Sequence, residues 1–184
     1  RAGLIETPTT MAMCTRSVRY RRVPDALRAN LSTWDKSFYD WGEMAVGPEN
    51  GFYRLTKYDT GKAGIVVAPI APRFAGRIWV VVGPDNSSAT FEFAQAVQLR
   101  KIGTLVGEPT GGNQRGINGG AFFFMTLPGS GIELDVPLIA QFPETPMPDA
   151  GLLPDLTAYA SADSIAAGRD VTLHIVRDKI VKHL

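Results

Sequence analysis

Residues 78–90 have the sequence Ile78-Trp79-Val80-Val81-Val82-Gly83-Pro84-Asp85-Asn86-Ser87-Ser88-Ala89-Thr90. The five apolar residues at its start are β-branched or aromatic, which favours a strand. A Gly-Pro pair and a group of turn-forming and helix-capping residues follow. This order predicts a buried strand over 78–82, a sharp turn, and a helix from about Ser88 to Lys101.

The two serines at the predicted helix start allow two interpretations. Serine, asparagine and aspartate are the ordinary residues at helix N-caps, so a capping role is the default. A hydroxyl at this place also lies over backbone N–H groups, which can stabilise negative charge on a reacting oxygen. We place Phe93, Ala94, Ala96 and Val97 of the helix on its apolar side.

The composition is that of one globular domain without a strong charge bias. The 184 residues are 45% hydrophobic and 20% charged, with a formal net charge of +1. The balanced charge predicts no nucleic-acid partner. The single cysteine, Cys14, excludes an internal disulfide, and His174 and His183 have no third ligand type nearby. We therefore expect no metal and no cofactor.

The sequence has no run that approaches the ~20 apolar residues of a membrane span, and no signal-peptide core. We expect no membrane span, and a periplasmic or secreted location if a signal was removed. Because the chain begins at Arg1 without a methionine, we interpret it as a piece of a longer protein.

We expect residues 1–184 to form a single, partial domain. Residues 1–76 are interpreted as an irregular arm rich in aromatic and basic residues, with a charged strand around Val18 and a short helix after Pro24. Residues 77–184 are interpreted as the regular core.

Further elements are predicted after the first helix. We expect a strand over 104–106, an irregular glycine-rich loop over 107–120, and a hairpin of strands 121–127 and 132–138. A last helix is expected to begin after Asp170, with an apolar stripe that consists of Leu173, Val176, Ile180 and Leu184.

Three motifs stand in a fixed order along this part of the chain. They are Ser88-Ala89-Thr90, Val106-Gly107-Glu108-Pro109-Thr110-Gly111 and Gly151-Leu152-Leu153-Pro154-Asp155. Over about residues 77–176 the chain resembles the C-terminal part of the catalytic domain of the tail-specific, or C-terminal-processing, serine peptidases (peptidase family S41). The resemblance implies an α/β fold of the crotonase/ClpP-like ββα type, with a twisted sheet flanked by helices.

The resemblance also implies the residues of a site. Ser88 matches the nucleophile, and Ala89 would offer its backbone N–H to the oxyanion, while Ser87 is left as the cap. The glycine-rich loop would form the wall of the site, with Gly112 and Gln114 as candidates for substrate contact. The implied partner is a peptide or protein substrate.

Two departures from the family pattern limit this site. The position of the family's catalytic lysine is occupied by Asn113, which cannot act as a base, and Arg115 keeps its proton at working pH. No glycine-rich segment that could supply a second oxyanion donor precedes Ile78. The catalytic base is therefore unassigned, and we expect the chain to be incomplete and inactive by itself.

The alternative is a non-catalytic ligand-binding or interaction module of the same fold. Asn113 favours this alternative, whereas a serine in the nucleophile turn does not. The run Phe122-Phe123-Phe124 places aromatic rings on both faces of one strand. It suggests burial on both sides, in a homo-oligomer or against a missing N-terminal half.

Overall fold

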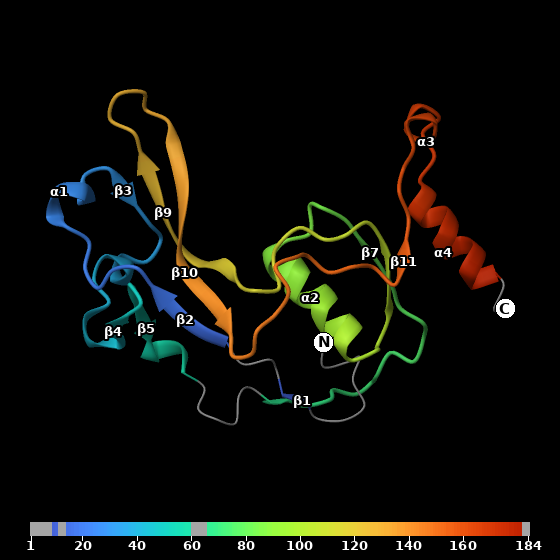
Figure 1. Cartoon of the computed structure of the whole chain (residues 1–184), viewed down its shortest axis with the longest axis horizontal. Coiled ribbons are helices and arrows are strands. Elements are labelled where there is room, and N and C mark those ends of the chain that lie inside the picture. The colour runs from blue at the N-terminus through green and yellow to red at the C-terminus, as the bar shows by residue number, and fades with distance from the viewer. Residues whose placement is uncertain (1–8, 11–13, 60–65, 182–184) are drawn as a thin grey trace. The chain divides into compact units, whose positions relative to one another are not determined.

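The computed structural model describes residues 9–10, 14–59 and 66–181 and shows a mixed α/β fold with antiparallel and parallel sheets (Figure 1). The chain divides into two compact units. We call Arg1–Thr9, Val66–Gln114 and Pro148–Leu184 the Ser88 unit, and Thr10–Ile65 with Arg115–Met147 the hairpin unit. Each is described by itself.

The hairpin unit is built on one antiparallel sheet of six strands. Their order across the sheet is β3 (Leu31–Ser32), β9 (Ile117–Thr126), β10 (Glu133–Pro143), β2 (Cys14–Val18), β5 (Phe52–Leu55) and β4 (Ala45–Glu49). Three short helical turns lie between these strands in the chain, namely α1 (Asp25–Arg28), η2 (Lys36–Tyr39) and η3 (Gly42–Met44), and a fourth, η4 (Thr56–Tyr58), follows β5. The segment that we expected to be irregular thus supplies four strands of a sheet, and α1 confirms the helix predicted after Pro24.

The long β9–β10 ribbon in Figure 1 confirms the predicted hairpin. Phe123 is opposite Val136, and the register shifts between Pro137 and Ile139. The predicted loop over 107–120 was too long, because β9 already begins at Ile117. The start of this strand is hard to predict because it contains two glycines, and glycine is rare in strands.

The core of the hairpin unit lies on one face of this sheet. Its buried residues are Val18, Val23, Phe38, Trp41, Ala45, Leu55, Ala121, Phe123 and Ile139. Phe38 and Trp41 stack with ring centroids 5.4 Å apart, and the hydroxyl of Tyr20 donates to the carbonyl oxygen of Phe38 at 2.7 Å. Burial raises the pKa of Tyr20 to about 12.

The phenylalanine run is divided between the two faces of β9. Phe123 is buried in the core, whereas Trp34 contacts Phe122 and Phe124 at centroid distances of 5.9 and 5.8 Å. The indole of Trp34 is itself largely exposed. The chain therefore covers part of the second face with its own tryptophan.

The basic residues of the N-terminal segment pack on aromatic rings. The guanidinium carbon of Arg16 lies 5.1 Å from the ring centroid of Tyr58, and that of Arg19 lies 4.2 Å from the centroid of Phe52. Each such contact is worth about 0.5–1 kcal/mol at an exposed site. Arg16 lies within β2, which confirms a charged strand that includes Val18, whereas Arg19 follows the end of that strand.

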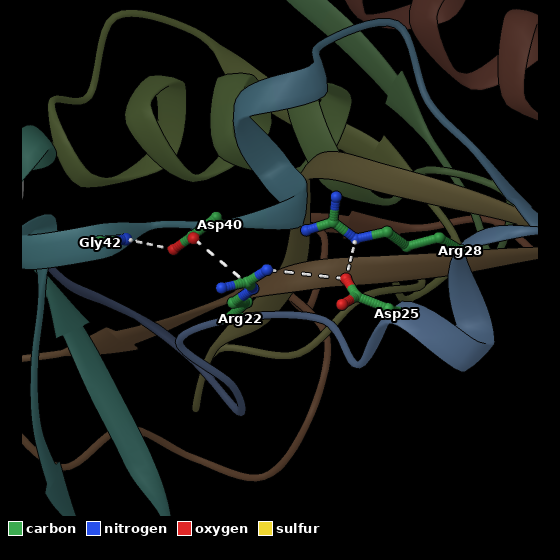
Figure 2. Close-up of polar contacts among 5 residues, drawn as sticks. All are labelled: Arg22, Asp25, Arg28, Asp40 and Gly42. Carbon is green, nitrogen blue, oxygen red and sulfur yellow. Dashed lines mark hydrogen bonds and ion pairs between the residues drawn. The ribbon is translucent and has the colours of Figure 1, made fainter.

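Figure 2 shows the ion pairs beside α1. Asp25 pairs with Arg22 at 3.6 Å and with Arg28 at 3.2 Å, and Arg22 also lies 3.8 Å from Asp40. The other carboxylate oxygen of Asp40 accepts a hydrogen bond from the Gly42 N–H. Because these side chains are largely exposed, each pair contributes at most about 1 kcal/mol.

The Ser88 unit contains a three-stranded parallel sheet in the order β11 (Leu156–Thr157), β8 (Thr104–Gly107) and β7 (Trp79–Val82). The helix α2 (Ser88–Leu99) connects β7 to β8 and confirms the predicted strand–turn–helix. The unit also contains the helices α3 (Ala162–Ala166) and α4 (Val171–Val181). A separate pair consists of the two-residue strands β1 (Thr9–Thr10) and β6 (Val66–Val67).

The core of this unit forms between α2 and the sheet. Its buried residues are Val82, Phe91, Ala94, Val97, Leu105 and Leu152. Ala94 and Val97 are buried in α2, as predicted. Ala96, which we also placed on the apolar side, is only partly buried, and the third buried residue is Phe91. Phe93 is partly buried against the same cluster.

The C-terminal helix begins where the sequence predicts, because a carboxylate oxygen of Asp170 accepts a hydrogen bond from the Leu173 N–H at 2.9 Å. Leu173 and Ile180 of the predicted apolar stripe are exposed, and Leu184, like His183, lies outside the described residues. The short helix α3 was not predicted, although Ser161 caps it. Within the described ranges, no helix has the length and hydropathy needed to cross a membrane.

The half-buried Tyr20 gives the fold a pH dependence. Because the pKa of Tyr20 is about 12 when folded and 10.0 otherwise, its contribution is complete below pH 10 and is lost as the pH rises toward 12. Replacement Tyr20→Phe should cost about 1 kcal/mol near neutral pH, through the lost hydrogen bond, and should flatten this alkaline decline. Urea unfolding at a series of pH values measures both effects. Tyr159→Phe, at an exposed position, is the control and should leave the decline unchanged.

Candidate functional site

Two hydrogen bonds between Gly83 and Asn86 close the turn between β7 and α2. The Asn86 N–H donates to the carbonyl oxygen of Gly83 at 2.9 Å, and the Asn86 side-chain oxygen accepts from the Gly83 N–H at 2.7 Å. Pro84 occupies the second position of this turn, where its fixed φ is favourable. The turn therefore directs the chain from the end of the strand into the helix with little freedom.

Ser87 occupies the N-cap position of α2, as predicted. Its backbone is extended, with φ −125° and ψ 179°, but its hydroxyl makes no capping hydrogen bond. Its carbonyl oxygen accepts a bond from the Thr90 hydroxyl at 2.8 Å. The carbonyl oxygen of Ser87 thus accepts the first bonds of the helix, whereas its side chain does not cap the helix.

Ser88 is the first residue of α2 and has a φ of 52°. This left-handed conformation costs a residue with a Cβ roughly 1–2 kcal/mol. The side chain is exposed, and the first-turn N–H groups of the helix, including that of Ala89, have no acceptor one turn earlier within the helix. A strained, exposed hydroxyl beside such donors is an arrangement suited to a nucleophile.

The glycine-rich loop after β8 lies directly against this turn. A Cβ atom on Gly111 would overlap the carbonyl oxygen of Pro84, so only glycine fits here without displacement. A Cβ atom on Gly112 would lie 3.1 Å from the ring of Phe91 in α2. The structure therefore brings the second motif of the sequence to the turn that carries Ser88.

The amide side chains of the loop bind the segment that precedes the third motif. The Asn113 amide nitrogen donates to a carboxylate oxygen of Asp149. Gln114 donates through its side chain to the carbonyl oxygen of Gly151 and through its N–H to that of Ala150, both at 3.0 Å. These bonds fix the loop to residues 149–151.

The third motif is bonded to both the loop and β8. Thr110 and Leu152 exchange two hydrogen bonds, from the Thr110 N–H to the Leu152 carbonyl at 3.0 Å and from the Leu152 N–H to the Thr110 hydroxyl at 2.8 Å. A carboxylate oxygen of Asp155 accepts from the Leu105 N–H at 2.7 Å. The second and third motifs are thus hydrogen-bonded to each other, and the first adjoins them through the packing of Gly111 against the turn at Pro84.

Sequence reasoning did not identify three polar residues of this cluster. Thr110 is buried, and Asp155 accepts a hydrogen bond from β8. Both residues are part of the motifs, but the sequence analysis gave neither of them a role. Asp149, the partner of Asn113, carries no signal in the sequence beyond its place among prolines. Long-range pairings of this kind do not follow from local patterns.

No titratable cluster marks a metal centre in this part of the chain. Among the described residues, no group of three histidine, cysteine, aspartate or glutamate side chains could hold an ion. His174 lies exposed in α4.

A family model described as Peptidase family S41 matches residues 17–139. The match includes the β7–α2 turn and the glycine-rich loop and ends before the Gly151–Asp155 motif. It also begins sixty residues before residue 77, where we placed the start of the resemblance (77 − 17 = 60). No curated protein matches the chain.

Among solved structures, the chain is similar to a crystal structure from Parabacteroides merdae ATCC 43184 described as a "putative peptidase". The two chains share 16% sequence identity, with a TM-score of 0.48. The similarity covers 96% of this chain and 44% of the other, so this chain spans less than half of that structure's length.

The backbone of Ser88 can be tested by stability measurements. Ser88→Gly should be about 1 kcal/mol more stable to urea than Ser88→Ala, because glycine adopts a φ of 52° without the steric cost. At Thr90, an exposed residue within the first turn of α2, the glycine variant should instead be less stable than the alanine variant. An equal difference at both positions would contradict the strain at Ser88.

Proposed function

Because the chain belongs to peptidase family S41, we propose that it carries the nucleophile half of a serine-type peptidase site. The proposed nucleophile is Ser88, whose oxygen would attack the carbonyl carbon of a peptide bond. An ester to Ser88, the acyl-enzyme, forms as the C–N bond breaks, and the serine proton passes through the unassigned base to the leaving amine. The proposed substrate is accordingly a peptide or a protein. The proposed fold is the crotonase/ClpP-like ββα type, of which the β7–α2–β8 unit would be a part.

The observation that carries this proposal is the backbone of Ser88. Its φ of 52° in an exposed strand-to-helix turn has a cost that a purely structural turn could avoid with glycine. Nucleophilic serines of other hydrolases sit on strained strand-to-helix turns for the same geometric reason.

The oxyanion that develops in this reaction needs hydrogen-bond donors. We assign one of them to the Ala89 N–H, which belongs to the first turn of α2. The loop with Gly112 and Gln114 would form the wall on the substrate side. The hydrogen bonds of the loop to residues 149–151 support such a positioning role. A shift of about one ångström in the wall would move the substrate carbonyl out of line with the Ser88 oxygen.

The second candidate function is a binding module without catalysis. It is favoured by Asn113, since the amide at the family's lysine position is bonded to Asp149 and has no basic nitrogen. Both candidates use the same surface near Ser88. They differ in whether the Ser88 oxygen forms a covalent bond.

Covalent labelling distinguishes the two functions. A fluorophosphonate should modify the wild-type chain slowly at one serine, and peptide mapping by mass spectrometry should locate the adduct at Ser88. The Ser88→Ala variant should lose the adduct, while the Ser87→Ala variant, one residue away, should retain it. A chain that stays unlabelled after long exposure, or a label that survives Ser88→Ala, would reject the peptidase assignment.

The missing base can be restored by substitution. Asn113→Lys combined with Asp149→Asn, which prevents an ion pair with the new lysine, should raise the labelling rate at Ser88 by at least about tenfold. General bases contribute roughly 10²–10⁴-fold when well placed. The same lysine at the next residue, Gln114→Lys, is the control and should have no such effect. Equal rates in all variants would show that position 113 does not face the Ser88 hydroxyl.

A further inference from the structure

One arginine of the hairpin unit is half-buried without a carboxylate beside it. Arg16 lies in the middle of β2, on the face of the sheet that also carries the buried Val18. Its guanidinium lies over the ring of Tyr58, which packs against the core, and it forms no hydrogen bond or ion pair with a residue that the structure describes. A charge that is partly withdrawn from water is usually paired, so an anion is the expected partner of this group.

The other arginines near Arg16 in the sequence are either bonded or exposed. Arg22 and Arg28 form ion pairs. Arg21 donates two hydrogen bonds to a backbone carbonyl oxygen, at 3.2 and 2.9 Å. Arg19 is exposed, so that water solvates its charge. Arg16 therefore differs from its neighbours in combining partial burial with the lack of a counter-charge.

Two further hydrogen-bond donors belong to the surroundings of this guanidinium. Gln141 of β10 is directly opposite Arg16, so the two side chains are neighbours on one face of the sheet. The side-chain oxygen of Gln141 accepts from the Cys14 thiol at 3.5 Å, which leaves its amide nitrogen to donate. Lys57 lies in η4, with its ammonium nitrogen 5.7 Å from the centroid of the Tyr58 ring. Two cations and an amide thus come together from three elements.

The acidic residues around η4 have other partners. Asp59, directly after η4, pairs with Arg54. Asp35 accepts a hydrogen bond from the Ser37 N–H at 2.9 Å, and this bond, followed by a smaller effect of the Lys57 charge, lowers the pKa of its carboxyl. Neither carboxylate supplies a counter-charge to the half-buried guanidinium.

We propose that Arg16, Gln141 and Lys57 bind a phosphate group, carried by free phosphate or by a small phosphate monoester. The guanidinium fork can donate two parallel hydrogen bonds, and the ammonium adds a second charge. Donors from three elements suit the several oxygens of a tetrahedral phosphate, whereas the fork alone satisfies a planar carboxylate. The ring of Tyr58 would hold the guanidinium in position. This site lies within the hairpin unit and does not depend on the proposed peptidase activity.

The test is a titration of the whole chain with inorganic phosphate at low ionic strength, followed by amide and side-chain NMR signals. The wild type should bind phosphate with a Kd of about 1 mM or tighter, and acetate at least about tenfold more weakly. The Arg16 Nε–H and the Gln141 amide signals should shift during the titration. Glycerol phosphate, titrated in the same way, identifies the carrier: tighter binding than that of inorganic phosphate indicates a monoester, and weaker binding indicates free phosphate.

Substitutions then locate the site. Arg16→Gln should raise the Kd for phosphate by at least about tenfold, and Arg16→Lys by about threefold, because lysine keeps the charge but lacks the fork. Lys57→Gln should raise it by about threefold, through the loss of the second charge. Arg19→Gln, which removes an exposed arginine of the same segment, is the matched control and should leave the Kd unchanged.

The amide spectra verify that each variant is folded, and Lys57→Gln, at an exposed residue, decides the matter if the Arg16 variants are not. A wild type whose Kd exceeds about 10 mM for both phosphates overturns the proposal. So does acetate that binds as tightly as phosphate, or a loss of affinity that is as large in Arg19→Gln as in the variants of the site.

Discussion

The close approach of Gly111 to the carbonyl oxygen of Pro84 is the constraint on which the Ser88 unit depends. It lets the loop after β8 lie on the turn after β7, where any side chain would separate them. The two hydrogen bonds between Thr110 and Leu152 then attach a third segment, distant in sequence, to the same loop. Three short motifs thereby become neighbours of one helix start.

This arrangement explains how a strained residue can persist at an exposed position. The Gly83–Asn86 turn is closed by two hydrogen bonds, and α2 is anchored by buried Phe91, Ala94 and Val97. Ser88 lies between these two fixed elements, so its φ is imposed by its surroundings. Strain of about 1–2 kcal/mol is small beside the burial of one phenylalanine and its neighbours. The backbone of Ser88 is thereby fixed, while its side chain is exposed.

Local signals allowed much of the fold to be predicted. The β-branched run before Gly83, the alternation in the hairpin and the carboxylate of Asp170 each act within a few residues, and each predicted the observed element. The six-stranded sheet was not predicted, because its pairing of β2 with β10 joins residues that are far apart in the chain. At the candidate site, the motifs were found but not the φ of Ser88 or the bond between Asn113 and Asp149, since both arise from tertiary packing.

The Asn113–Asp149 bond bears on how the family's chemistry could have changed in this chain. A lysine at position 113 would be held by the same carboxylate as an ion pair, which favours its protonated form and so opposes a role as base. The amide of Asn113 makes a neutral partner for Asp149 and keeps the loop attached to residues 149–151. In this chain, position 113 therefore serves the geometry of the loop, while Ser88, the proposed nucleophile, has a strained backbone and an exposed side chain.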